Sequence, residues 1–185
     1  MLKRSFDLAA SLAGLLLLAL PMAAIALWVR LDSPGPSLHW SQRFGVGGRL
    51  FAMPKFRTMR QGTPQLPTHL LADGQNRVTR AGRFLRRTSL DELPQLWSVL
   101  VGEMSLVGPR PALFNQDDLM ELRRQAGVDH LRPGITGWAQ VNGRDELPLP
   151  QKVAFERQYL ERQSFLFDLR IILLTLVRGQ QGVAH

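Results

Sequence analysis

Apolar side chains dominate the start of the chain, where residues 8–29 carry no formal charge. A continuous helix of about 22 residues would be long enough to cross the hydrocarbon core of a bilayer. Pro21 interrupts this run, and a proline inside a helix removes one backbone hydrogen bond and clashes with the preceding turn. The pattern therefore predicts one helix, a break at Leu20 and Pro21, and a second helix.

Three interpretations of this segment are open from the residues alone. It could be an anchor that spans the membrane. It could be a cleaved signal peptide, because the residues 24–26 have the small-residue spacing of a cleavage site. It could also be a re-entrant hairpin that enters and leaves on one face. Lys3 and Arg4 precede the run and Arg30 follows it, whereas a spanning helix usually concentrates its basic residues on one side.

The remainder of the chain mixes short strands, glycine-containing turns and amphipathic helices. Residues 38–43 and 50–53 flank a glycine-rich connection and predict a β-hairpin, which 55–59 continue. Helices are expected over 89–101, 115–124, 150–163 and 165–177, and loops over 61–76 and 132–144, the latter with a brief strand. The predicted fold class is α+β, mainly helical with a small β-hairpin.

The charge balance favours an anionic partner. Lysine and arginine number 23 against 15 acidic residues, which gives a formal net charge of +8. Nucleic acid, acidic lipid and a phosphorylated substrate all fit this balance. Arginines recur every third residue from Arg77 to Arg86, either as a solvated face or as a stripe that faces phosphates or headgroups.

Residue types also exclude several kinds of chemistry. The chain has no cysteine, which excludes a disulfide scaffold, thiolate catalysis and cysteine-ligated metal sites. Its four histidines are scattered, which disfavours a histidine-rich metal centre. Hard cations bound by oxygen ligands remain open. There is no Walker A sequence, so a nucleotide would not be held by a standard phosphate loop.

The adjacent acids Asp91 and Glu92 are the most informative local feature. Pro94 is tolerated only in the first turn of a helix, so the helix should begin between Ser89 and Asp91. Ser89 and Glu92 match a capping box, which would explain the glutamate without any function. In the functional interpretation, Asp91 stays ionised at the helix start and attacks phosphorus, while the neighbouring glutamate holds Mg²⁺.

Several basic residues stand in conformationally stiff positions. Arg110 lies between two prolines, Arg132 precedes a Pro-Gly pair, and Arg144 ends an Asn-Gly turn. Fixed guanidinium groups of this kind, together with Lys55, could neutralise the charge that develops on a diphosphate during transfer. Together with the acidic pair they favour phosphoryl-transfer chemistry.

Seven ordered segments resemble the bacterial sugar transferase family, the monotopic phosphoglycosyl transferases. The segments are Lys3-Arg4-Ser5-Phe6-Asp7, Lys55-Phe56-Arg57-Thr58-Met59, Ser89-Leu90-Asp91-Glu92-Leu93-Pro94-Gln95-Leu96, Met104-Ser105-Leu106-Val107-Gly108-Pro109-Arg110-Pro111, Arg132-Pro133-Gly134-Ile135-Thr136-Gly137, Gln140-Val141-Asn142-Gly143-Arg144, and Ser164-Phe165 followed by Asp168-Leu169. Any one of them alone would be weak, but together they cover nearly the whole chain.

The resemblance implies transfer of a sugar 1-phosphate from a UDP-sugar to polyprenyl (undecaprenyl) phosphate, with release of UMP. This would be the first membrane step in assembly of an O-antigen, exopolysaccharide or glycoprotein glycan, on the cytoplasmic face of the bacterial inner membrane. Asp91 would form a covalent phosphosugar intermediate, and Glu92 would bind Mg²⁺ and help to activate the acceptor. The phosphate-binding set implied by position is Lys55, Arg86, Arg110, Arg132, Arg144 and Asp168.

The resemblance also changes the interpretation of the first segment. The family's N-terminal helix is re-entrant, so a hairpin is expected over residues 1–34, with a cytoplasmic catalytic domain and interfacial helices over 35–185. Many relatives have Ser-Pro at the membrane break where this chain has Leu20-Pro21. The chain begins directly at this segment, which is expected of the minimal form of the family.

The expected partners are a UDP-sugar, polyprenyl phosphate and membrane lipids, with a second copy of the chain as a further option. The rival hypothesis is a nucleic-acid-binding protein tethered to the membrane. Nucleic acid is not expected, because the sequence holds no recognisable helix-turn-helix, RNA-recognition or zinc module and only 8% aromatic residues.

Overall fold

A computed structural model of the chain describes residues 2–64, 74–143 and 147–178. In chain order the elements are α1 (Leu2–Leu17), α2 (Ala19–Asp32), β1 (Leu38–Phe44), η1 (Val46–Gly48), β2 (Leu50–Phe56), α3 (Gly74–Arg77), α4 (Arg80–Thr88), η3 (Leu90–Glu92), α5 (Gln95–Val101), β3 (Ser105–Val107), α6 (Asp117–Gln125), β4 (Gly134–Thr136), α7 (Trp138–Val141), α8 (Leu149–Arg162) and α9 (Phe165–Arg178). The predicted mainly helical α+β class is confirmed.

The first two helices form a bent pair. The bend is 61° and lies at Leu18, not at Leu20 and Pro21 as expected. Pro21 falls in the first turn of α2, where a missing N–H costs nothing, and its ring would clash with the carbonyl of Leu17 if α1 continued. Among the described residues no single helix is long and apolar enough to cross a membrane, whereas α1 and α2 together meet that criterion.

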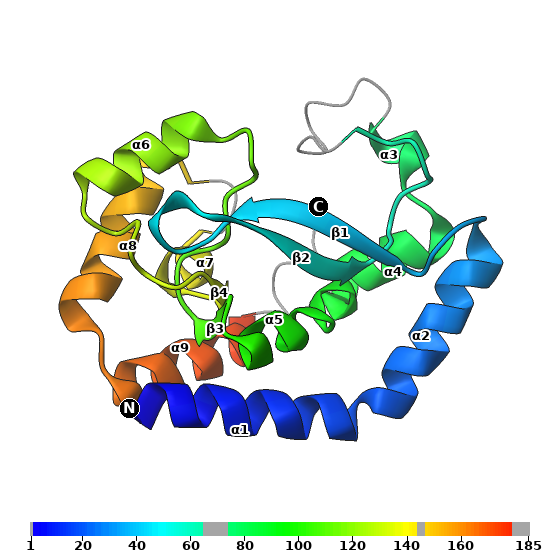
Figure 1. Cartoon of the computed structure of the whole chain (residues 1–185), viewed down its shortest axis with the longest axis horizontal. Helices are drawn as coiled ribbons and strands as arrows, with labels where there is room; N and C mark the ends of the chain where they lie inside the picture. The colour runs from blue at the N-terminus through cyan, green and yellow to red at the C-terminus, as the bar shows by residue number, and fades with distance from the viewer. Residues whose placement is uncertain (1, 65–73, 144–146, 179–185) are drawn as a thin grey trace.

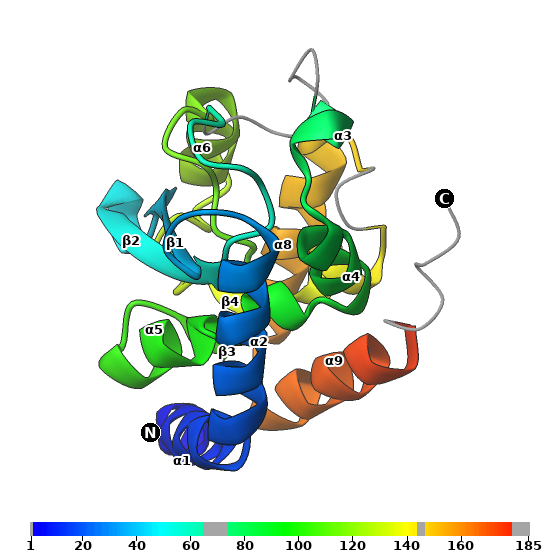
Figure 2. The same cartoon turned by 90° about the vertical axis from the view of Figure 1, so that its right-hand side faces the viewer.

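The predicted hairpin is confirmed. β1 pairs antiparallel with β2, from Leu38 opposite Phe56 to Phe44 opposite Leu50. A second, parallel pair joins β3 and β4. In Figure 1 the hairpin crosses the middle of the molecule, α1 runs along one edge and α2 rises from its end. α5 and α9 lie on either side of β3 and β4 (Figure 2).

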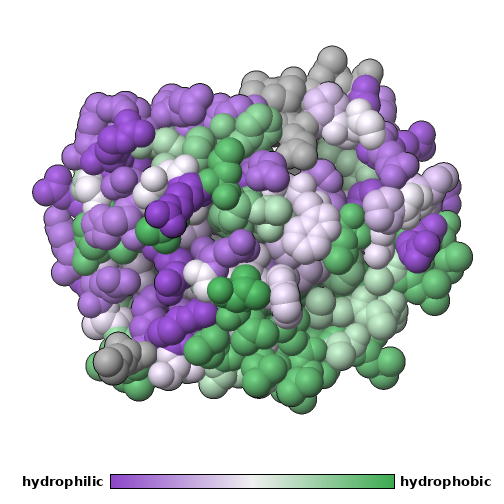
Figure 3. All heavy atoms as spheres, in the orientation of Figure 1, coloured by the Kyte–Doolittle hydropathy of each residue, from purple (hydrophilic) through white to green (hydrophobic). Residues whose placement is uncertain are grey.

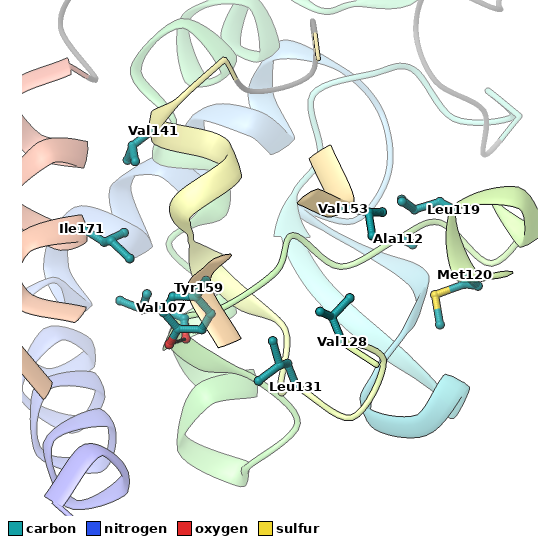
Figure 4. Packing of buried hydrophobic residues seen from close by; sticks show 10 residues of the cluster. All are labelled: Val107, Ala112, Leu119, Met120, Val128, Leu131, Val141, Val153, Tyr159 and Ile171. Atoms are coloured by element: carbon teal, nitrogen blue, oxygen red, sulfur yellow. Dashed lines mark hydrogen bonds between the residues drawn. The ribbon is translucent and has the colours of Figure 1, made fainter. Parts of the chain in front are cut away.

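Three of the expected helices form close to the predicted bounds, and these are α6, α8 and α9. Pro150 lies in the first turn of α8, where proline is favoured. The main core is built between them and includes Val107, Val128, Tyr159 and Ile171 (Figure 4).

A second cluster of buried side chains joins α2, β2 and α4. It contains Val29, Phe56, Ala81 and Leu85, which are at most 2% exposed. Because Phe56 ends β2 in this cluster, the hairpin is fixed against both α2 and α4.

Polar contacts hold α1 against the rest of the protein. Arg4 donates to the carbonyls of Val99 (2.7 Å) and Leu100 (3.1 Å) at the end of α5. The last carbonyls of a helix lack partners within it, and the negative end of the helix dipole favours a cation there. Asp7 is 2% exposed and accepts from the Ser105 hydroxyl at 2.8 Å. These contacts explain why charged residues begin an otherwise apolar helix.

Asp168 forms a second polar anchor for α1. Its Oδ2 accepts from Lys3 Nζ at 2.7 Å, and its Oδ1 accepts from the Tyr159 hydroxyl at 2.7 Å. Lys3 also donates to the Val107 carbonyl at 3.0 Å. Burial, followed by the hydrogen bond to Asp168, raises the pKa of Tyr159, so its hydroxyl stays protonated and donates.

Replacing Asp168 with alanine should destabilise the protein, because Lys3 and Tyr159 would lose their acceptor. We expect a loss of about 2–3 kcal/mol in the free energy of unfolding, the range for hydrogen bonds to charged groups. Denaturant unfolding of the purified chain would measure it. Glu121→Ala is the control, since the Glu121–Arg124 pair is exposed and should contribute less than about 1 kcal/mol. Equal losses of unfolding free energy in the two variants would contradict the anchoring role of Asp168.

Candidate active site

Asp91 lies in a short turn between two helices. α4 ends at Thr88, and Ser89 then adopts a left-handed conformation with φ of 56°, while its N–H bonds back to the carbonyls of α4. The 3₁₀ turn η3 carries Asp91 and Glu92, and α5 begins only at Gln95. The expected continuous helix and the Ser89 capping box are therefore wrong, because the Ser89 side chain makes no capping hydrogen bond. Glu92 is left available for other contacts.

The Asp91 carboxyl is buried among charges. The residue is 9% exposed. Burial, and then the neighbouring Glu92, raise its pKa to about 6, while Lys55 and Arg86 oppose the shift. An acid with this pKa is still mostly ionised at pH 7. Nearby cations therefore favour the ionised form of Asp91 that was expected. The dipole of a long helix does not contribute as expected, because no long helix starts here.

Lys55 acts electrostatically on this carboxyl from β2, which packs against η3. Burial, and then the positive charge of Arg43, lower the pKa of Lys55 to about 8. Asp91 acts in the opposite direction and favours the ammonium form. The lysine is therefore a cation near neutral pH and can lose its proton a little above it.

The residues that follow Lys55 each meet a different neighbour. Phe56 enters the second core cluster. Arg57 donates to the carbonyls at the end of α2, including that of Ser33 at 2.7 Å. Thr58 accepts from Arg86 Nε at 2.9 Å. One extended segment thus connects the acidic pair, the core and the bent helix pair.

Arg86 is placed by a close contact between α4 and this segment. A Cβ on Gly82 would lie 2.0 Å from the Thr58 carbonyl oxygen, so only glycine permits the approach. The same approach sets the Arg86 guanidinium beside Thr58 and within the electrostatic influence of Asp91. Burial lowers the pKa of Arg86, and Asp91 partly restores it. Arginine remains charged at any physiological pH.

Arg110 completes the group that the structure brings together. Its Nη2 lies 3.1 Å from Glu92 Oε1, and the two side chains are 40% and 23% exposed. Arg110 also acts electrostatically on Lys55. Asp91, Glu92, Lys55, Arg86 and Arg110 therefore form one charged cluster, with its open side at Arg110 and Glu92.

The structure does not show the three remaining predicted phosphate-binding residues in this cluster. Asp168 is 2% exposed and bound to Lys3 and Tyr159, so its observed contacts anchor α1 instead of joining the cluster. Arg132 is exposed, and the segment that follows it pairs with β3. Arg144 lies outside the described residues.

Arg43 is a member of the cluster that the sequence analysis missed. In the observed register His39 pairs with Lys55, and Arg43 lies on the same face of the hairpin, because side chains alternate along a strand. Its Nη1 donates to the Pro111 carbonyl at 3.1 Å. The predicted hairpin could have suggested this residue, since it fixes which positions share a face with Lys55.

The protein could supply only some of the ligands that a magnesium ion needs. Among the described residues there is no group of three or more His, Asp or Glu side chains that could hold a metal. Mg²⁺ commonly takes one or two carboxylates and completes its shell with water and substrate phosphate oxygens. The partly exposed Glu92 carboxylate, beside Asp91, fits that arrangement. A buried carboxylate near several cations has the chemistry needed to attack an anionic phosphorus centre.

Comparison with known proteins gives a consistent result. Residues 1–181 match the family described as bacterial sugar transferase. A UDP-glucose:undecaprenyl-phosphate glucose-1-phosphate transferase from Xanthomonas campestris pv. campestris is 45% identical over 85% of this chain. A UDP-N-acetylgalactosamine-undecaprenyl-phosphate N-acetylgalactosaminephosphotransferase from Aeromonas hydrophila is 36% identical over 95% of it. An uncharacterized sugar transferase from Bacillus subtilis (strain 168) is 40% identical over 95%.

The lengths of these relatives differ. The chain spans 34% of the Xanthomonas protein and 43% of the Aeromonas protein, but 85% of the Bacillus protein. The family match nevertheless covers residues 1–181 of the 185, including every described element and the whole charged cluster. The chain belongs to the bacterial sugar transferase family.

Proposed function

We propose that the chain transfers a sugar 1-phosphate from a UDP-sugar to polyprenyl phosphate and releases UMP. The observation that carries the proposal is the buried Asp91 carboxyl within the electrostatic influence of Lys55 and Arg86, next to the Glu92–Arg110 pair. The names of the Xanthomonas and Aeromonas relatives, which describe this class of reaction with different sugars, support it. The glycan made from the product would belong to bacterial surface or glycoprotein assembly.

The first step is an in-line displacement at the sugar-bearing phosphorus. An Asp91 oxygen forms a bond to that phosphorus, and the bond from phosphorus to the bridging oxygen breaks, so that UMP leaves with the electron pair. The product is an aspartyl-phosphosugar. Lys55 and Arg86, which already face the carboxylate, are suited to stabilise the charge that develops on the phosphate oxygens.

In the second step an oxygen of polyprenyl phosphate attacks the same phosphorus, and the bond to Asp91 breaks. This regenerates the carboxylate and yields a lipid-linked diphosphosugar. Glu92 would hold Mg²⁺ together with substrate oxygens, and the ion would neutralise phosphate charge. Arg110, bound to Glu92 Oε1, keeps that carboxylate at the open side of the cluster, where both substrates must arrive. Arg132 and Arg144 are further phosphate-binding residues of the proposal.

A lipid-linked acceptor requires a site at the membrane, and we place α1 and α2 in it as a re-entrant hairpin. The side chains at the bend are strongly exposed, with Leu17 at 80% and Leu20 at 81%. The hydrophobic surface gathers along the lower right of Figure 3, over the end of α1 and the start of α2. Other exposed apolar side chains on α2, α5 and α9 are Leu27, Leu31, Trp97, Val101, Leu166, Leu173 and Leu176.

The exposed face of α4 suits the headgroup layer beside this hairpin. Phe84 packs on Trp28 of α2, with ring centroids 5.5 Å apart, and the Arg87 guanidinium carbon lies 6.0 Å from the Phe84 centroid. Arg80 and Arg83 are exposed on the same helix. Aromatic rings and arginines together are typical of the membrane–water interface. The proposal thus divides the chain into a membrane segment (1–34) and a catalytic domain (35–185) on the cytoplasmic face of the inner membrane.

Incubation with a UDP-sugar and Mg²⁺ but no acceptor should leave a phosphosugar adduct on the peptide that contains Asp91, detectable by mass spectrometry. A panel of UDP-sugars would also identify the donor through UMP release. Asp91→Asn should abolish the adduct and lower UMP release by about 10³-fold or more, because the nucleophile is lost.

Glu92→Gln is the matched control for that experiment. It removes the neighbouring charge but leaves the nucleophile, so the adduct should form more slowly on the same peptide. An adduct that persists in Asp91→Asn would assign the nucleophile to another residue.

The pH dependence of UMP release should be bell-shaped. Activity should increase as the pH rises through about 6, because Asp91 must lose its proton to attack. It should decrease above about 8, where Lys55 loses its positive charge. Lys55→Arg should remove the alkaline limb and retain the acid limb, because arginine stays charged. An acid limb near the ordinary aspartate pKa would contradict the role of the buried Asp91 carboxyl.

Topology can be tested with single cysteines, because the chain has none of its own. Leu2→Cys and Pro36→Cys, both at exposed positions, should react with a membrane-impermeant maleimide from the same side of oriented vesicles. Leu17→Cys at the bend should be protected until detergent is added. Labelling of positions 2 and 36 from opposite sides would show that the pair spans the membrane.

A further inference from the structure

The segment of residues 109–112, which contains Pro109, Arg110 and Pro111, has few backbone donors of its own. Its two prolines have no N–H group, so they cannot donate to a neighbouring strand. The segment nevertheless carries the guanidinium that binds Glu92 at 3.1 Å. Its position must therefore be set mainly by what binds its carbonyl oxygens.

Four consecutive carbonyls of this segment are bound by donors from elsewhere in the chain, and the first, that of Pro109, accepts from the Gly134 N–H of β4 at 2.8 Å. Arg123 Nη2 donates to the Arg110 carbonyl at 2.8 Å. Arg43 Nη1 donates to the Pro111 carbonyl at 3.1 Å. The Phe44 N–H donates to the Ala112 carbonyl at 2.9 Å. The donors come from β4, α6 and β1, so the segment is held from three elements.

Arg123 is itself fixed by a buried ion pair. Its Nε lies 2.8 Å from Glu156 Oε2 on α8, its Nη2 contacts Oε1, and the two side chains are 5% and 2% exposed. A buried ion pair often contributes little net stability, because both charges lose their hydration. The ion pair also orients the Arg123 guanidinium, and this role is separate from any contribution to stability.

We propose that Arg43 and Arg123 are positioning residues that hold the carbonyls of Pro111 and Arg110, so that the Arg110 guanidinium faces Glu92. The inference rests on the proposed function for its kinetic test. It adds two arginines that act through Arg110, and Glu156, which orients Arg123. The positive charge that Arg43 places beside Lys55 is consistent with its location at the edge of the same cluster.

The test replaces the buried pair by apolar side chains of similar volume, as Arg123→Met with Glu156→Leu. Such replacements are often tolerated, because no unpaired charge is left in the core. The double variant should keep its melting temperature within a few degrees of the parent. Its kcat for UMP release should decrease by about 10- to 100-fold, the range expected for a misplaced catalytic group.

A purely structural loss is separated from positioning by repeating the substitution in an Arg110→Ala background. If the pair acts through Arg110, its removal should change kcat less than twofold there, since coupled residues are not additive. The full loss in both backgrounds, or no loss in the parent, would overturn the proposal. Arg157→Gln with Glu161→Leu, an exposed ion pair on α8, is the matched control and should leave kcat unchanged.

Two further measurements keep the proposal testable. If the double variant fails to fold, Arg43→Gln is measured in the same two backgrounds. If the parent releases no UMP, the proposed function fails, and amide hydrogen exchange still tests the positioning. The N–H groups of Phe44 and Gly134, which donate to carbonyls of this segment, should exchange about tenfold faster in the double variant than in the control, and unchanged exchange would contradict the inference.

Discussion

Backbone carbonyls bound by cationic side chains set the positions of the elements around the candidate site. Arg4 binds the end of α5, Arg57 binds the end of α2, and Arg43 and Arg123 bind the segment after β3. A guanidinium suits this role because it presents five donors in a rigid fork, and helix ends leave carbonyls without partners. Part of the net charge of +8 therefore serves the chain's own backbone.

This use of arginine explains where sequence analysis succeeds and where it fails. Hydrophobic periodicity and turn residues are local signals, and they correctly predict the hairpin, α6, α8 and α9. The motif segments also lead to Asp91, Glu92, Lys55, Arg86 and Arg110, which do meet in space. The sequence does not show whether a given arginine will face a ligand or a carbonyl, because that depends on distant elements.

The errors have specific physical causes. The capping box at Ser89 matches in sequence, but the backbone there is left-handed, whereas a capping residue is usually extended, and the serine side chain makes no capping hydrogen bond. The bend of the first two helices moves to Leu18 because Pro21 constrains the turn before it. The phosphate-binding role implied for Asp168 stays a prediction, and in the structure its carboxylate is bound by Lys3 and Tyr159, which lie far apart along the chain.

The charged cluster combines an acid with a raised pKa and a base with a lowered one. Burial moves Asp91 and Lys55 toward each other on the pH scale, to about 6 and about 8. Between these values both groups are mostly charged, and a modest change in their surroundings could change the protonation state of either one. A site of this kind can adapt its protonation to the charge of the ligand beside it.

The extended segment that carries Lys55 and Arg57 has one more consequence. Lys55 lies near the end of β2 and Arg57 directly follows the strand, and they act on Asp91 and bind the end of α2 respectively. If α1 and α2 are seated in lipid, the short spacing between Lys55 and Arg57 sets the height of the Asp91 carboxyl above the acyl chains. Variation in bilayer thickness would then tilt the protein as a whole and leave that height unchanged.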